Sequence, residues 1–292
     1  MIFLLSFLVA AIALPDSPQA TTLARRYREG ERLVYVMEGE HQDLLGTTRY
    51  SARATGEVRK NDAGAFIEVF EWSDLLRDGR PVTLSDSARN LRQILSLSPA
   101  VRPGLPDLAQ APELNGPLCD LLTFYADLWI AALFQLRKPG DHAAFPAPGA
   151  NSWASGPNMR IAEDAVDFDL ALKEVDERTQ VAVLIVKHLP PAQSRIKIPA
   201  EWMKEPVGER PNNWIQVIRN DDGTVTAEVG LESFEDELRI DLRDGKILSA
   251  TMENPVDVVR CVCADEALTR RGDPVRYRIR RRIQIRLVSP LD

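Results

Sequence analysis

The fold is decided by the stretch VRYRIRRRIQIRLV, residues Val275–Val288. Apolar and basic residues alternate along it with a period of two, which places them on opposite faces of a β-strand. Arg281 is the one basic residue on the apolar side. The stretch predicts a long antiparallel strand with one face against the core and the other face in water.

Other segments also read as strands. Residues 49–59 alternate in the same way, whereas Phe66–Trp72 and Val181–Val186 are apolar on both parities, which is typical of central strands covered on two sides. Asp-Gly pairs at 78–79 and 244–245 separate apolar runs and predict hairpin turns.

Two helices are expected between the strand sets. Ser85 or Asp86 can cap a helix that runs to about Leu97. Residues Leu118–Leu136 form a strongly apolar helix whose narrow polar stripe is Asp120, Thr123 and Asp127. Because two acids make it a poor membrane span, we expect this helix to be buried against the sheet.

The sequence therefore predicts an α+β protein dominated by antiparallel β-sheet, with long curved strands in an open or partly closed barrel-like sheet and a helical insert packed on it. We expect strands in 24–84, the helical insert with a Pro-rich linker in 85–145, and strands in 146–292 that form one continuous domain with 24–84. This topology resembles that of periplasmic lipid and lipoprotein carriers, in which helices cover a curved half-barrel. The likeness is one of inferred architecture alone.

Composition and the N-terminus indicate export. The 292-residue chain has a net charge of −7, which argues against a nucleic-acid partner. Ile2–Leu14 is apolar and uncharged, and Ala11-Ile12-Ala13 supplies a small-x-small cleavage pattern, so residues 1–13 are predicted to be a signal peptide. No cysteine precedes Cys119, which excludes lipid attachment at a processed N-terminal cysteine. We expect a periplasmic or extracellular protein that is not a lipoprotein and has no transmembrane span in its mature chain.

The three cysteines do not form a metal-binding motif. Cys261 and Cys263 are two residues apart and poorly placed to bond each other, whereas Cys119 could pair with either. We expect buried thiols with at most one disulfide bond.

Complete sequence motifs of catalysis are missing. Ser194-Arg195-Ile196-Lys197 has the Ser-x-x-Lys spacing of penicillin-recognising enzymes, but prolines crowd the segment and no Lys-Thr-Gly follows. The histidines are His41, His142 and His188, and none has the spacing of a zinc or di-iron site. The chain also has no Gly-x-Ser-x-Gly turn, phosphate-binding loop or dinucleotide-binding motif. We therefore expect no catalytic residues, no metal and no cofactor. A hydrolase that uses His142 or His188 with a nearby serine and acid is kept as an alternative.

The leading functional hypothesis is non-enzymatic binding of an amphipathic, lipid-like ligand or a partner peptide. It follows from the strand with one apolar face, the apolar helix and the missing catalytic motifs. The residues expected to line the pocket are the large apolar side chains of the helix and of one strand: Leu122, Tyr125, Trp129, Leu133, Phe66, Phe70 and Trp72.

An alternative hypothesis concerns the basic face of the last strand. Arg276, Arg278, Arg280 and Arg282 could bind anionic polymers of the cell envelope. The simpler interpretation is that they form cross-strand ion pairs. The acids considered as partners are Glu237 and Asp241, or Asp167 and Asp169.

Overall fold

Strand β15 (Val275–Val288) lies near the centre of one antiparallel sheet. It connects the N-terminal strands of this sheet to the C-terminal strands. It pairs with β1 (Arg32–Asp43) on one side and with β14 (Ile247–Cys263) on the other. Ile283 and Ile285 on its apolar parity are 1% and 2% exposed. The long strand with one buried face, predicted from the alternation, is confirmed.

The computed structural model describes residues 23–98, 101, 108–146, 151–154 and 161–288. The predicted signal peptide, residues 1–13, lies outside the described residues. Of the described residues 52% are in strands and 14% in helices, and the sheet is not closed. The expected fold class is confirmed, and of the two sheet forms considered the open one is correct.

The N-terminal strands follow one another through hairpins. From β1 the sheet continues through β2 (Gly46–Lys60), β3 (Phe66–Arg77) and β4 (Arg80–Pro81). Since β1 also pairs with β15, the N-terminal and C-terminal strands share one sheet. The Asp-Gly pairs at 78–79 and 244–245 form the predicted turns, with both glycines at a φ of 74°.

The sheet forks at β14. The first half of this strand pairs with β13 (Phe234–Asp241) and the second half with β12 (Val225–Glu232). One branch continues from β13 through β10 (Val181–Leu189), β9 (Asp167–Asp176) and β6 (His142–Pro146). The other continues from β12 through β11 (Trp214–Arg219), β8 (Ile161–Asp164) and β7 (Asn151–Ala154). The 3-10 helix η3 (Glu201–Lys204) adds Met203 to the core of this second branch.

The first predicted helix is shorter than expected. Helix α1 (Asp86–Asn90) begins with the Ser85 hydroxyl accepting from the Ala88 amide, as predicted, but it ends at Asn90 instead of near Leu97. Residues Gln93–Leu95 form strand β5, which pairs with β3. The buried Gln93 side chain accepts from Trp72 Nε1 and donates to the Leu118 carbonyl, so tertiary contacts outweigh the helical pattern here.

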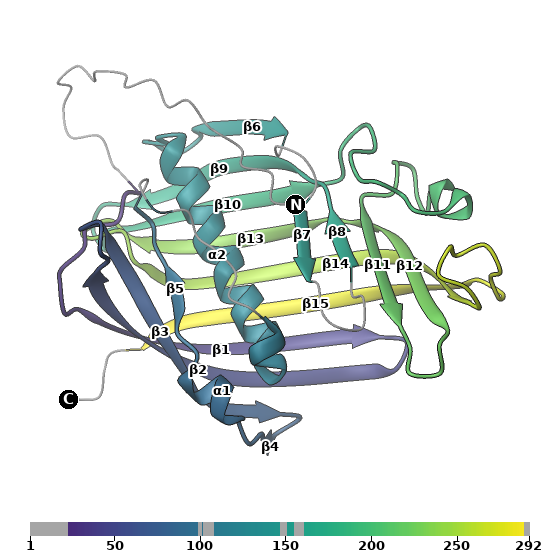
Figure 1. The fold of residues 1–292 in the computed structure, drawn as a ribbon. Coiled ribbons are helices and arrows are strands. Elements are labelled where there is room, and N and C mark those ends of the chain that lie inside the picture. Colours follow the sequence, from purple (N-terminus) through teal and green to yellow (C-terminus); the bar gives the residue numbers. More distant parts are fainter. Residues whose placement is uncertain (1–22, 99–100, 102–107, 147–150, 155–160, 289–292) are drawn as a thin grey trace.

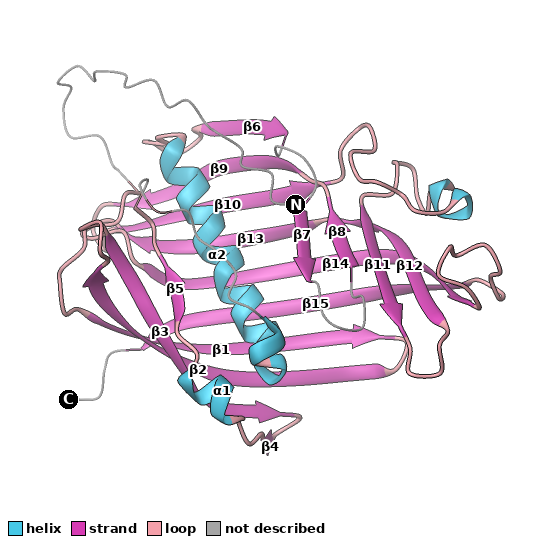
Figure 2. Cartoon of the chain, viewed as in Figure 1, coloured by secondary structure: helices cyan, strands magenta, loops and turns pink. Residues whose placement is uncertain are grey.

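The second predicted helix is confirmed and begins slightly earlier. After two 3-10 turns, η1 (Leu108–Gln110) and η2 (Pro112–Leu114), α2 runs over Asn115–Leu133 with Pro117 in its first turn, where no helical hydrogen bond is lost. Pro112–Leu133 is the one segment of the described residues long and apolar enough to cross a membrane. Figures 1 and 2 show that α2 lies across the strands, from the β6 edge toward β1 and β2.

The helix covers the main apolar core. Leu118, Leu121, Phe124, Tyr125 and Leu128 are fully or almost fully buried against the apolar face of the sheet. All three cysteines are free thiols, so the possible disulfide bond does not form.

One contact beside α2 depends on a glycine. Gly39 of β1 lies opposite Tyr50 of β2, and the Tyr50 ring covers it so closely that a Cβ atom at this position would lie 2.1 Å from Tyr50 Cε1. A glycine covered by an aromatic ring on the neighbouring strand is a known way to keep a curved sheet packed.

We predict that Gly39→Ala lowers the free energy of unfolding by about 1–3 kcal/mol, because the Tyr50 ring must leave its place. Urea unfolding measures the change. Gly116→Ala is the matched control: its Cβ would lie 3.6 Å from the same ring, at ordinary contact, within a helix that favours alanine. Equal destabilisation by the two substitutions would contradict the proposed packing.

Candidate functional site

A line of polar side chains lies between α2 and the sheet, and we call it the polar seam. The two acids of the predicted polar stripe, Asp120 and Asp127, point from the helix into it and are 2% and 1% exposed. The other members come from the strands beneath the helix. The seam consists of Tyr50, Asp120, Asp127, His188, Glu232, Asp236, Asn254 and Arg281.

The outer end of the seam is an ion pair. Arg281, the basic residue on the apolar side of β15, pairs with Asp120, and the Tyr50 hydroxyl donates to the other carboxylate oxygen of Asp120 at 2.6 Å. Burial raises the pKa of Asp120, although the Arg281 charge opposes the shift. The Arg281 side chain is 33% exposed, so the seam meets solvent at this residue.

The middle of the seam links this ion pair to deeper acids. Arg281 Nη1 lies 3.5 Å from Asn254 Oδ1, and Asn254 Nδ2 donates to Glu232 Oε1 at 3.1 Å. Burial raises the pKa of Glu232, and the hydrogen bond from Asn254 opposes this shift.

The inner end joins three side chains from three elements. Asp127 of α2, His188 of β10 and Asp236 of β13 each present a nitrogen or oxygen atom within 4.8 Å of the others. His188 Nε2 lies 2.9 and 3.1 Å from the two carboxylate oxygens of Asp127. Both carboxylate oxygens of Asp236 are buried without a hydrogen-bond donor among the described residues.

Burial controls the protonation of this inner group. It lowers the pKa of His188 to about 4, so the imidazole is neutral at neutral pH. It also raises the pKa of Asp127 to about 7 and, together with the nearby Asp127 charge, raises that of Asp236 well above its ordinary range. The pair of carboxyl groups lies close enough to share one proton.

A row of aromatic rings runs from solvent to the inner group. Phe145, Phe168, His188 and Phe234 lie directly opposite one another on β6, β9, β10 and β13. Successive ring centroids are 5.2, 4.4 and 3.5 Å apart. Phe134, just after α2, stacks on Phe145 at 4.6 Å and is 43% exposed. We call these five rings the aromatic row.

The residues expected to line a ligand pocket are mostly part of the core. Phe70, Trp72, Leu122 and Tyr125 are at most 6% exposed and belong to one hydrophobic cluster. Trp129 is partly buried and packs against this cluster. Phe66 stacks on Tyr27, and Leu133 is 48% exposed at the end of α2. Their role in ligand binding stays a prediction.

Two of the four arginines considered on β15, Arg278 and Arg282, form cross-strand ion pairs, but not with the acids considered from the sequence. Arg278 makes two 2.7 Å contacts with Asp257, and Arg282 lies 3.0 Å from Glu253; both acids are on β14, the neighbouring strand. Arg276 and Arg280 make no ion pair with the described residues. The acids suggested earlier pair with other side chains: Glu237 with Lys173, Asp241 with Arg243, Asp167 with Arg195 and Asp169 with His142.

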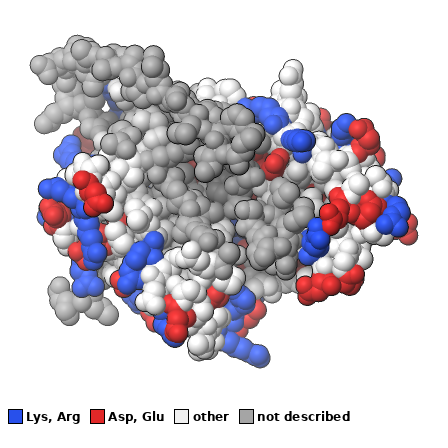
Figure 3. Space-filling model, viewed as in Figure 1, with Lys and Arg blue, Asp and Glu red and all other residues white. Residues whose placement is uncertain are grey.

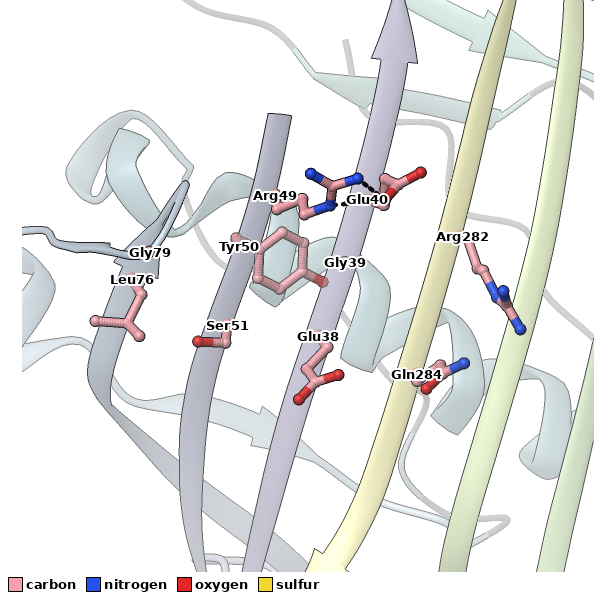
Figure 4. Close-up of a pocket in the computed structure, with 10 residues that line it drawn as sticks. All are labelled: Glu38, Gly39, Glu40, Arg49, Tyr50, Ser51, Leu76, Gly79, Arg282 and Gln284. Atoms are coloured by element: carbon pink, nitrogen blue, oxygen red, sulfur yellow. Dashed lines mark hydrogen bonds and ion pairs between the residues drawn. The ribbon is translucent and has the colours of Figure 1, made fainter. Parts of the chain in front are cut away.

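A shallow pocket of about 300 Å³ lies beside Arg282, on the strand faces turned away from α2. Figure 4 shows two acids and two bases among its lining residues, Glu38, Glu40, Arg49 and Arg282, with Arg49 and Glu40 paired at 2.7 Å. The charges of the lining cancel, so the pocket is not a basic platform. On the α2 side, Figure 3 likewise shows basic and acidic side chains of the described residues intermixed. Binding of an anionic polymer stays a prediction.

Among the described residues, the other two histidines pair with acids, and the hydrolase alternative stays a prediction. His142 pairs with Asp169 at the surface, and His41 lies 3.3 Å from Asp43. The hydrogen-bond partners of His142 and His188 are thus aspartates rather than serines.

Sequence analysis did not predict the inner group, because its three members come from distant parts of the chain and have no local spacing. A weaker signal was present. His188, Asp236 and Arg281 each occupy a core-facing position on a strand that is otherwise apolar on that face, and Asp127 lies on the narrow polar stripe of an apolar helix. Polar residues at such positions require buried partners, and the structure brings these partners together.

Comparison with known proteins gives no functional assignment. No protein-family model matches the sequence, and no curated protein is significantly similar to it.

We predict that Arg281→Gln lowers the free energy of unfolding by about 3 kcal/mol, because Asp120 is left buried without its cation. Urea unfolding measures this change. Arg282→Gln is the control, because it removes the exposed ion pair of the neighbouring residue with Glu253. It is expected to lower the free energy of unfolding by less than about 1 kcal/mol. Adding Asp120→Asn to Arg281→Gln is expected to recover part of the loss. Equal effects of the two arginine substitutions would show that the buried pair does not position α2.

Proposed function

We propose that this chain is an exported, non-enzymatic binding protein for a lipid-like amphipathic molecule. The observation that carries the proposal is the aromatic row, which begins with exposed rings at the end of α2 and continues to a buried polar group. An amphipathic ligand needs such a combination of apolar contact area and nearby polar atoms.

The proposed binding region lies at the exposed end of the row. Leu133 and Phe134 are 48% and 43% exposed and follow each other at the end of α2. Phe134 stacks on Phe145, which in turn stacks on Phe168, so an apolar chain laid along this edge would contact several rings. Burial of the apolar surface of these rings and of the ligand would favour binding by roughly 25 cal/mol for each Å² removed from water.

The open sheet supports this location. In a closed barrel the sheet has no free edge, whereas here β6 ends one branch beside α2. The core beneath α2 is already filled by residues such as Phe70 and Tyr125. These observations favour a ligand site beside the C-terminal end of the helix instead of under its middle.

We predict that the purified protein binds a fluorescent long-chain fatty acid saturably, and that Leu133→Ser with Phe134→Ser weakens this binding at least tenfold. Fluorescence titration measures the affinities. Leu45→Ser is the matched control, since Leu45 is 90% exposed at the tip of the β1–β2 hairpin, away from the row. No saturable binding by the unmodified protein, or equal binding by all variants, would refute a lipid-like ligand at this edge.

Export is a separate part of the proposal and is supported by the apolar segment Ile2–Leu14. We predict that protein recovered from the exported fraction has lost about the first 13 residues. Its intact mass, followed by organic extraction, checks both the cleavage and any bound lipid. A full-length mass would contradict cleavage, and a bound peptide would replace the lipid as ligand.

A further inference from the structure

We propose that Asp127, His188 and Asp236 bind one divalent transition-metal cation beneath α2. The three residues supply one imidazole nitrogen and carboxylate oxygens from two further elements, all within 4.8 Å of one another. This donor set suits zinc and neighbouring first-row metals, which combine imidazole and carboxylate ligands.

The unpartnered side chain of Asp236 points to a missing ligand. It is 0% exposed, and no nitrogen or hydroxyl donor among the described residues reaches its oxygens; the one group within hydrogen-bonding reach is the carboxyl group of Asp127. A buried carboxylate without a partner is costly, and native proteins satisfy such groups with donors, water or metal ions. Asp236 faces Asp127, another acid, so the described side chains around it add negative charge rather than remove it.

The charges of the seam lead to the same conclusion. Its buried acids are Asp120, Asp127, Glu232 and Asp236, and its one permanent cation is Arg281, which pairs with Asp120. Two carboxylates and a neutral imidazole carry a charge of −2, which a divalent cation balances. Without the cation, the acids must hold a proton between them.

The ligands are held in place before the metal arrives. The His188 ring lies between Phe168 and Phe234, at centroid distances of 4.4 and 3.5 Å, and presents Nε2 to Asp127. Asp236 lies two residues beyond Phe234 on the same face of β13, next to His188. Four-coordinate zinc needs ligand atoms roughly 3.4 Å apart. His188 Nε2 and the Asp127 oxygens, at 2.9 and 3.1 Å, would move slightly apart to admit the ion, and all three ligand atoms already lie within 4.8 Å of one another.

The metal would fasten the helix to the sheet. Asp127 belongs to α2, whereas His188 and Asp236 belong to neighbouring strands of the branch beneath it. Binding would require α2 to be docked, so the ion would stabilise the folded protein by linkage. This role does not depend on the proposed lipid-like ligand.

The test is titration of the chelator-treated, full-length protein with Zn²⁺ by isothermal titration calorimetry, with thermal unfolding in parallel. We expect one Zn²⁺ per chain and a higher melting temperature in excess Zn²⁺ than in EDTA. We expect Asp236→Asn to weaken binding by more than the roughly 10–100-fold that loss of an outer-shell partner causes. It should also remove the melting-temperature increase.

The variants separate a metal site from a fold defect. Asp236→Asn keeps the side-chain shape and removes a buried charge, so the metal-free variant is expected to melt at or above the temperature of the metal-free parent. His142→Ala, which removes an exposed His–Asp pair, is the control and should bind Zn²⁺ unchanged. Co²⁺ in the site should give visible absorption bands that Asp236→Asn lacks. No stoichiometric binding by the parent, or full binding by Asp236→Asn, would overturn the proposal in favour of carboxyl groups that share a proton.

Discussion

The position of helix α2 depends on the burial of its two acids against the sheet. A helix with the apolar composition of α2 could slide or rotate on an apolar surface at small cost, since hydrophobic contact has no direction. Asp120 and Asp127 remove this freedom, because each must meet its own partner: Arg281 and Tyr50 for the first, His188 for the second. Buried polar pairs of this kind add little net stability but penalise every alternative arrangement strongly.

The burial of these two acids also shows which features could be predicted from the sequence and which could not. The alternation in Val275–Val288 and the polar stripe on Leu118–Leu136 are local patterns, and they predicted the long strand, the buried helix and the dominance of antiparallel sheet. Whether the sheet was open or partly closed was not decided by them. Arg281 is out of place in the alternation, and this is visible in the sequence. Its partner could not be predicted, because Asp120 lies 161 residues earlier in the chain.

Other features depend on tertiary contacts that no local pattern encodes. The fork at β14 arises because two different strands pair with the two halves of one strand. Gln93–Leu95 forms a strand instead of continuing the helix. Pairing with β3 and the buried hydrogen bonds of Gln93 stabilise this segment more than one additional turn of helix would. The inner group joins Asp127 to His188 across 61 residues, which explains why spacing motifs for metals or catalysis did not reveal it.

The aromatic row gives the inner group its environment. The rings of Phe168 and Phe234 on the two neighbouring strands remove water from around His188. Burial keeps the imidazole neutral and opposes charge on Asp127 and Asp236. A fully apolar replacement of the three residues would avoid the cost of burying them, so their presence at the contact between helix and sheet is not explained by packing. The exposed end of the row faces solvent and the inner end faces α2, so one line of rings connects a surface suited to apolar molecules with the group that holds the helix. The two proposed binding sites, for a lipid-like molecule and for a cation, would therefore both lie against α2 or the residue that follows it.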